Sequence, residues 1–317
     1  MKRFILRFGC FAAIVLAVLG GVCAVEVVAE IRAYRQEVIA PCGASVLLCG
    51  DSQLAHGVDP SVCSAFFNFS ADGRTLDQAY LTMLDVLDAP ANRGRIRQVV
   101  FDVSPASLVW RSGKPIGDLD FAGRYWLAHL LHPKASRAFR SFGGWVRVAR
   151  DNLVGRRFRL LWRAARGKAT FKSSLCGGFW AMTDVGMDSP ETFAKTVAFK
   201  ARQSDGFDAV DVGGFPYRVL EKVVAAAQAR GVEVVLVSTP WHADLVRACG
   251  EASADRFERR LSAFAAARQC RYVSFLRTAF PPSDWLDANH LNVRGAAKFT
   301  KLLAETLEKK GRSTTNE

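Results

Sequence analysis

Five short, mostly apolar segments alternate with segments of helical periodicity, and this alternation constrains the fold more than any other feature. The apolar segments are residues 45–49, 66–69, 98–103, 232–237 and 271–274. The helical patterns cover residues 75–87, 215–230, 253–269 and 293–309, with Asn292 placed to cap the last helix. Strands that alternate with helices favour an α/β fold, a doubly wound parallel sheet with helices on both faces.

Polar clusters follow four of these predicted strands. They are Gly50-Asp51-Ser52, residues 70–73, Ser104-Pro105 and residues 238–242. The carboxyl ends of parallel strands meet at one edge of a sheet, where ligands bind in folds of this kind. We therefore expect the functional site at this edge.

Two short motifs contain the residue types of a nucleophilic triad. Ser52 follows the end of the first predicted strand, and the last predicted helix is preceded by Asp287-Ala288-Asn289-His290. A serine hydroxyl needs an adjacent base to become nucleophilic, and an imidazole needs a carboxylate to orient it. We assign Ser52 as nucleophile, His290 as base and Asp287 as the orienting carboxylate. Asp284 is the competitor for Asp287, and a mere helix cap is the alternative role of Ser52.

These motifs, with Leu291-Asn292 and Gly295-Ala296 after them, resemble the signatures of the SGNH/GDSL hydrolase superfamily. The likeness is greatest to its membrane-anchored branch, which acts on acyl groups of cell-envelope polymers. The resemblance implies a flavodoxin-like fold of about five strands and ester chemistry at Ser52, without a metal or other cofactor.

The same resemblance implies three oxyanion-hole donors: the nucleophile's amide, a glycine after the second strand and an asparagine after the third. Ser52 and Gly73 match the first two. The third strand is followed by Ser104 and lacks the family's Gly-x-Asn-Asp, so Ser104, or a residue of a later insertion, is the expected substitute. Loss of one donor costs about 2.7–4 kcal/mol of barrier, which argues against an ordinary soluble esterase.

Four further residues at the same edge are candidates to line a substrate pocket. They are Asp51, His56, Trp241 and His242. A turn of Thr-Pro followed by an aromatic residue also occurs in the anchored relatives, which favours Trp241 and His242. The alternative is that these are ordinary polar or aromatic loop residues.

The pattern of charges at the N-terminus predicts that the protein is exported. Lys2, Arg3 and Arg7 precede an uncharged run of 18 residues, from Phe8 to Val25. Such a run can span a bilayer, with the positive end in the cytoplasm and the following domain on the extracytoplasmic side. Cleavage as a signal peptide after residues 22–24 is the alternative. We expect residues 1–38 to form a signal anchor and juxtamembrane helix.

The remaining chain divides into a catalytic domain, residues 39–310, and a disordered tail, residues 311–317. A helical insertion is expected at about residues 106–213, and it contains five of the seven tryptophans. Within it, residues 134–172 carry twelve Lys or Arg and one acid, out of a net charge of +13. This basic, aromatic stretch predicts contact with an anionic membrane or polymer, or else a solvated helix face. Without a nucleic-acid-binding motif, nucleic acid is not expected as a partner.

Cysteine usage gives no metal signature. The eight cysteines include no Cys-x-x-Cys pair, although one disulfide is possible in an exported domain.

These features together predict an exported, membrane-tethered serine esterase or O-acyltransferase. Its substrate would be an acylated glycan or envelope polymer, and a membrane-bound O-acyltransferase is a possible partner. The alternative is a catalytically weak SGNH-like accessory protein that binds polymer in a polysaccharide-modifying complex.

Overall fold

The computed structural model describes residues 9–11, 21, 32, 34–72, 74–109, 179, 190–203 and 214–308. The chain forms two compact units, and the unit of residues 38–115, 121–123 and 171–317 contains the sheet. No helix in these described ranges is long and apolar enough to cross a membrane. Most of the predicted anchor, the Arg-rich stretch and the tail lie outside the described residues.

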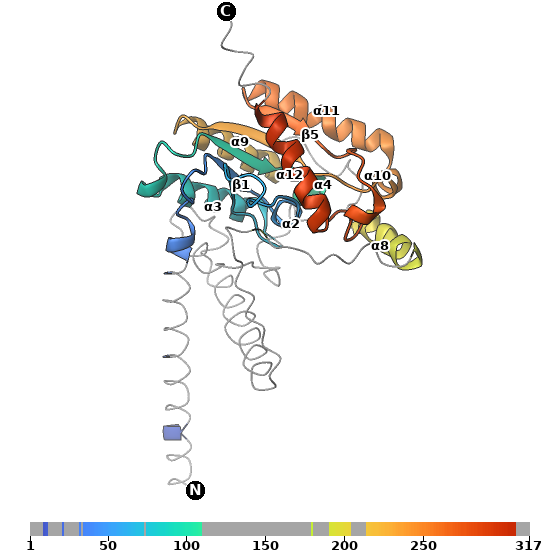
Figure 1. Cartoon of the computed structure of the whole chain (residues 1–317), viewed down its shortest axis with the longest axis horizontal. Helices are drawn as coiled ribbons and strands as arrows, with labels where there is room; N and C mark the ends of the chain where they lie inside the picture. Colours follow the sequence, from blue (N-terminus) through green and yellow to red (C-terminus); the bar gives the residue numbers. More distant parts are fainter. Residues whose placement is uncertain are drawn as a thin grey trace, which may run out of the picture. The chain divides into compact units, whose positions relative to one another are not determined.

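A five-stranded parallel sheet forms the centre of this unit, in the order β2-β1-β3-β4-β5. Figure 1 labels its strands β1 and β5 among the helices. The strands are β1 Val46–Cys49, β2 Phe66–Asn68, β3 Gln98–Asp102, β4 Glu233–Ser238 and β5 Arg271–Ser274. Each of the five predicted strands is present, with ends shifted by one residue at most. The predicted α/β fold with a parallel sheet is therefore confirmed.

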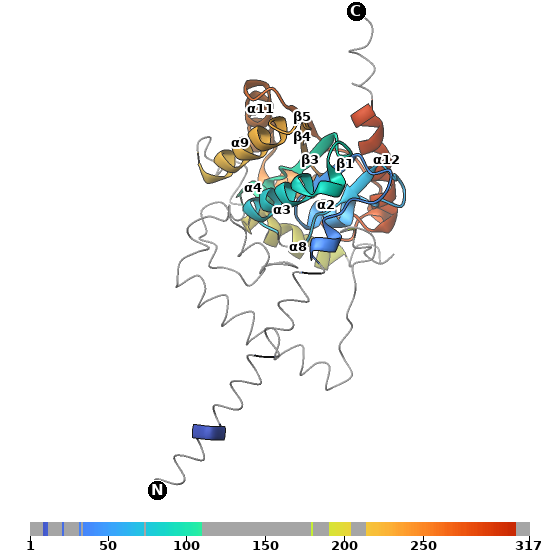
Figure 2. The same ribbon diagram turned by 90° about the vertical axis from the view of Figure 1, so that its left-hand side faces the viewer.

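Helices cover both faces of the sheet, as the fully buried side chains of the central strands require. On one face α3 (Leu76–Asp88) packs against α9 (Phe215–Gln228), and on the other α2 (Ser52–Gly57) packs against α12 (Val293–Glu308). Figure 2 shows α9 and α12 on opposite sides of the strands. A capping box, in which Thr75 and Gln78 bond to each other's backbone, starts α3.

The core beneath α12 joins the sheet to the loop before this helix. Phe299 of α12 lies edge-on to Phe275, with ring centroids 5.1 Å apart. Trp285, in the loop, is buried in the same cluster. The polar residues of this loop are thus anchored to the sheet by packing.

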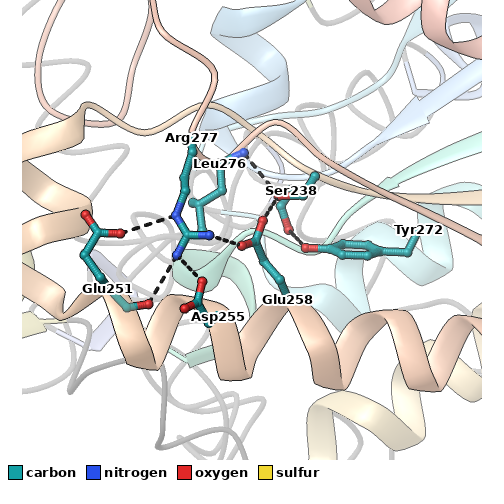
Figure 3. A network of polar contacts seen from close by, with 8 residues as sticks. Ser238, Glu251, Asp255, Glu258, Tyr272, Leu276 and Arg277 are labelled. Atoms are coloured by element: carbon teal, nitrogen blue, oxygen red, sulfur yellow. Dashed lines mark hydrogen bonds and ion pairs between the residues drawn. The ribbon is translucent and has the colours of Figure 1, made fainter.

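The edge near β5 is fixed by charge. The Arg277 guanidinium forms ion pairs with Glu251, Asp255 and Glu258 of α11 (Glu251–Ala267), as Figure 3 shows. Beside it, the Tyr272 hydroxyl lies 2.9 Å from the Ser238 hydroxyl, and burial raises the pKa of this tyrosine to about 12. These contacts attach the chain after β5 to α11.

α11 begins two residues earlier than predicted. Gly250, with a φ of +96°, ends α10 (Ala243–Cys249) and starts α11 directly after it. A positive φ is accessible to glycine without steric cost, so this residue allows the abrupt change of direction.

Two helices are described inside the predicted insertion or at its start. They are α4 (Pro105–Val109) and α8 (Pro190–Gln203), and α8 packs against α10. Two short 3₁₀ helices complete the described elements, Pro90–Asn92 and Pro282–Asp284.

Candidate active site

Ser52 is the first residue of α2, directly after the end of β1. A side chain at Gly50 would place its Cβ 2.5 Å from Cβ of Asp102, so the close approach of β1 and β3 requires glycine there. Asp51 caps α2, since its Oδ1 accepts a hydrogen bond of 2.8 Å from the Gln53 amide. Gly50 and Asp51 thus each have a structural reason, and together they place Ser52 at the start of α2.

A continuous chain of hydrogen bonds joins the three predicted triad residues. Ser52 Oγ lies 2.9 Å from His290 Nε2, and His290 Nδ1 lies 2.9 Å from Asp287 Oδ2. Residues 238 positions apart in the sequence meet here because both lie at the carboxyl edge of the sheet.

Asp287 is held as a carboxylate. Its Oδ1 accepts hydrogen bonds from the amides of Asn289 (2.9 Å) and His290 (3.0 Å), and lies 2.8 Å from Nζ of Lys200. Burial by itself would raise the pKa of Asp287. The hydrogen bond and charge of His290, with the Lys200 ammonium, outweigh burial and hold this pKa well below its usual range.

The loop around Asp287 is shaped by local contacts. Trp285 and Leu291 form an antiparallel bridge, and Asn292 caps α12 by accepting from the amides of Arg294 (3.0 Å) and Gly295 (3.2 Å). A Cβ at Gly295 would lie 2.3 Å from the carbonyl oxygen of Asp284. The Leu-Asn-x-x-Gly sequence therefore serves to dock α12 against this loop.

Asp284, the competing carboxylate, has another partner. Its buried side chain pairs with Nζ of Lys298 on α12 at 2.6 Å. The structure places Asp287, and not Asp284, against the imidazole of His290.

His290 is kept in its neutral form by its surroundings. Burial lowers its pKa, and the charges of Lys200 and His56 act in the same direction, while Asp287 opposes them. A neutral imidazole is the form that can accept a proton from a hydroxyl at neutral pH.

His56 is buried and lies next to His290 instead of in an open loop. The two rings are edge to face, with centroids 5.6 Å apart. His56 Nε2 lies 2.7 Å from Oδ1 of Asp72, whose side chain is exposed. His56 and Asp72 thus form a second histidine–aspartate pair, whose imidazole ring contacts that of His290.

The structure corrects the expectation that Ser104 is an oxyanion donor. Ser104 is fully buried, and its amide and hydroxyl both donate to Asp102 Oδ1, at 2.9 and 2.5 Å. Its oxygen also accepts from the Thr239 amide at 2.9 Å. With both donors used inside the protein, Ser104 links the ends of β3 and β4. Gly73, the other predicted donor, lies outside the described residues.

A pair of carboxylates, Asp51 and Asp102, lies next to Ser52 at the ends of β1 and β3. The Ser107 hydroxyl is 3.1 Å from Asp51 Oδ2 and 2.7 Å from Asp102 Oδ2. Burial, and then the charge of Asp102, raise the pKa of Asp51 well above its ordinary value. One hydroxyl has a single proton to donate, so a proton on Asp51 provides the donor that this contact otherwise lacks.

The two residues predicted after β4 differ in their surroundings. Trp241 is almost completely buried. His242 caps α10, and its ring lies edge-on to Phe193 and Trp285, with centroid distances of 4.8 and 5.5 Å. Burial lowers the pKa of His242. His242 therefore packs against the loop of Asp287, whereas Trp241 is part of the core.

Lys200 makes a contact with the predicted triad that the sequence motifs do not predict. It lies on α8, far from both motifs in sequence, and its ammonium also contacts the side-chain oxygen of Asn289. Its spacing could have identified it, because Phe193, Val197 and Lys200 share one helix face and the first two are buried. A lysine on a buried face needs a carboxylate partner.

The sequence matches no protein-family model and no curated protein. Among solved structures, the chain is similar to a protein from Bacteroides fragilis assigned as an acylhydrolase, at 12% identity and a TM-score of 0.41, covering 88% of this chain and 95% of the other. It is also similar to phospholipase A1 from Streptomyces albidoflavus, at 12% identity and a TM-score of 0.34, covering 84% and 99%.

Proposed function

We propose that the chain is a serine esterase or O-acyltransferase. The observation that carries the proposal is the chain of two 2.9 Å hydrogen bonds from Ser52 through His290 to Asp287. This is the arrangement in which a base can activate a serine hydroxyl while a carboxylate stabilises the imidazolium that forms.

The proposed reaction has two halves. Ser52 Oγ attacks the acyl carbonyl while His290 Nε2 takes the hydroxyl proton, and Asp287 stabilises the charged imidazole. His290 then gives this proton to the leaving alcohol, which leaves an acyl-serine. In the second half water or a sugar hydroxyl attacks the acyl group, so that hydrolysis or transfer regenerates Ser52.

The developing oxyanion needs donors beside Ser52. The Ser52 amide is at the first turn of α2, where amides have no partner within the helix, and it is our first candidate. Gly73 remains the second candidate from the family resemblance. Ser104 is excluded from this set because its donors are used by Asp102.

The setting that we propose is the extracytoplasmic face of a bacterial membrane. The charge-free run of residues 8–25 after three basic residues supports a tether. The resemblance of the motifs to envelope acyl-hydrolases supports an acylated glycan or envelope polymer as substrate, and a membrane-bound O-acyltransferase as partner. Cell fractionation of the full chain, compared with a chain that lacks residues 1–38, tests the tether. Full-length protein in the soluble fraction would refute it.

Labelling with a fluorophosphonate tests the chemistry, because such probes phosphonylate only activated serines. The full chain in mild detergent should be labelled, and mass spectrometry should locate the adduct on Ser52. Ser52→Ala should abolish labelling, whereas Ser61→Ala, at an exposed serine of the loop after α2, should not affect it. A folded protein without labelling would favour the accessory-protein alternative.

A further inference from the structure

A residue outside the triad contacts its carboxylate directly. Lys200 Nζ lies 2.8 Å from Asp287 Oδ1 and also contacts Oδ1 of Asn289. Asp287 Oδ2 faces His290 Nδ1 at the same time. The ammonium and the imidazole therefore bind different oxygens of one carboxylate.

Packing holds Lys200 in this place. Phe193 and Val197, on the same face of α8, are buried, and the Phe193 ring lies edge-on to His242 of α10. The Lys200 side chain is only 20% exposed. Burial lowers the pKa of Lys200, and the charge and hydrogen bond of Asp287 act against this shift, so the ammonium form depends on the Asp287 carboxylate.

We propose that Lys200 is a positioning residue of this site: its ammonium fixes the Asp287 carboxylate toward His290 and keeps His290 able to accept a proton at mildly acidic pH. The inference rests on the proposed esterase function. It assigns to α8, which lies within the segment between β3 and α9, a direct part in the chemistry.

The direction of the effect follows from the charges around His290. Asp287 favours the imidazolium, whereas Lys200 disfavours it by repulsion and by drawing negative charge from Asp287. Among the described residues, His56, which is paired with Asp72, also faces His290, and Asp51 also acts on Lys200. Removal of the Lys200 charge leaves these groups in place, so the pKa of His290 should rise toward, or past, its ordinary value.

The experiment is the pH dependence of fluorophosphonate labelling of the full chain. In Lys200→Met the acid limb should move to higher pH, so that the ratio of the labelling rate at pH 6 to that at pH 8 falls. Lys200→Gln, which keeps a donor but not the charge, should show the same shift. Lys200→Arg should restore the wild-type profile. Lys195→Met, the same change at an exposed position of α8, is the matched control.

A second readout does not depend on activity. In a Ser52→Ala background, the His290 ring should titrate at higher pH by NMR after Lys200→Gln than before it. A purely structural role would lower the labelling rate at every pH and leave both titrations unmoved, and that result would overturn the proposal. Absence of labelling in the wild-type chain would instead refute the esterase function, so the two failures are distinguishable.

Discussion

Two aspartates near Ser52, Asp287 and Asp51, have pKa values that are shifted in opposite directions. Asp287 receives donors on both oxygens, from His290, the backbone and Lys200, and its pKa is far below the usual range. Asp51 faces a second carboxylate, Asp102, across the Ser107 hydroxyl, and its pKa is raised.

The contrast shows that the surroundings, and not the residue type, decide what an aspartate does at this site. Burial raises the pKa of both groups, but only Asp287 has enough donors and positive charge nearby to overcome it. The carboxylate on the His290 side can stabilise an imidazolium. Asp51, with its raised pKa, caps α2 at the residue before Ser52.

The strongest test of this comparison is to replace each of the two aspartates, Asp287 and Asp51, by asparagine. Asp287→Asn should lower turnover of a short acyl ester by about 10⁴-fold, the typical loss when a triad aspartate becomes neutral. Asp51→Asn should leave turnover close to wild type, because asparagine keeps the Oδ1 acceptor that caps α2 and resembles a protonated aspartate. Steady-state kinetics measure both, and equal losses would end the distinction.

A steric change tests whether the loop of Asp287 depends on its contact with α12. Gly295→Ala should reduce the free energy of unfolding by about 1–3 kcal/mol, since its Cβ would meet the Asp284 carbonyl at 2.3 Å. Gly57→Ala is the control, because its Cβ would have an ordinary contact with Phe299 at 3.5 Å. Chemical denaturation of both variants makes the comparison, and an equally stable Gly295→Ala would contradict the close approach.

Asp284→Asn should separate stability from activity within one loop. Loss of its buried partnership with Lys298 should cost about 1–3 kcal/mol of stability, while turnover of the folded enzyme stays near wild type. If this variant loses more activity than Asp287→Asn, the carboxylate behind His290 has been misidentified.

The smallest expected effect is a pH dependence of stability at Asp51. A carboxyl with a raised pKa in the folded state binds a proton on folding, so its contribution to stability falls as pH rises above its unfolded pKa of about 4. The Asp51→Asn variant has no carboxyl group at this position, so it does not lose this stability as the pH rises. The free energy of unfolding of the variant, relative to wild type, should therefore increase from pH 4.5 to pH 7.5 in denaturant titrations. A difference that does not change with pH would mean that Asp51 is ionised.

Local patterns made part of this molecule predictable. Buried strands are visible in the sequence as short apolar runs. The polar clusters at their ends could be assigned to one edge of the sheet because parallel strands run in the same direction. Asp287 and His290 are only three residues apart, within a single turn, so their contact could be predicted from the sequence. The contact of Ser52 with His290 could also be predicted. Ser52 follows the first predicted strand and His290 precedes the last predicted helix, and both positions belong to the same edge of the sheet.

Other contacts depend on side chains that no local pattern connects. Ser104 has the right position for an oxyanion donor, yet the packing of β3 against β4 turns its donors inward to Asp102. The pKa of Asp51 is raised by burial and by the charge of Asp102, and both depend on how the ends of β1 and β3 pack together. The sequence by itself determined the sheet, the edge at which the polar clusters meet and the residues of the candidate triad. Only the tertiary structure decided the charge states and brought Lys200 to Asp287, because burial and charge pairing arise from long-range contacts.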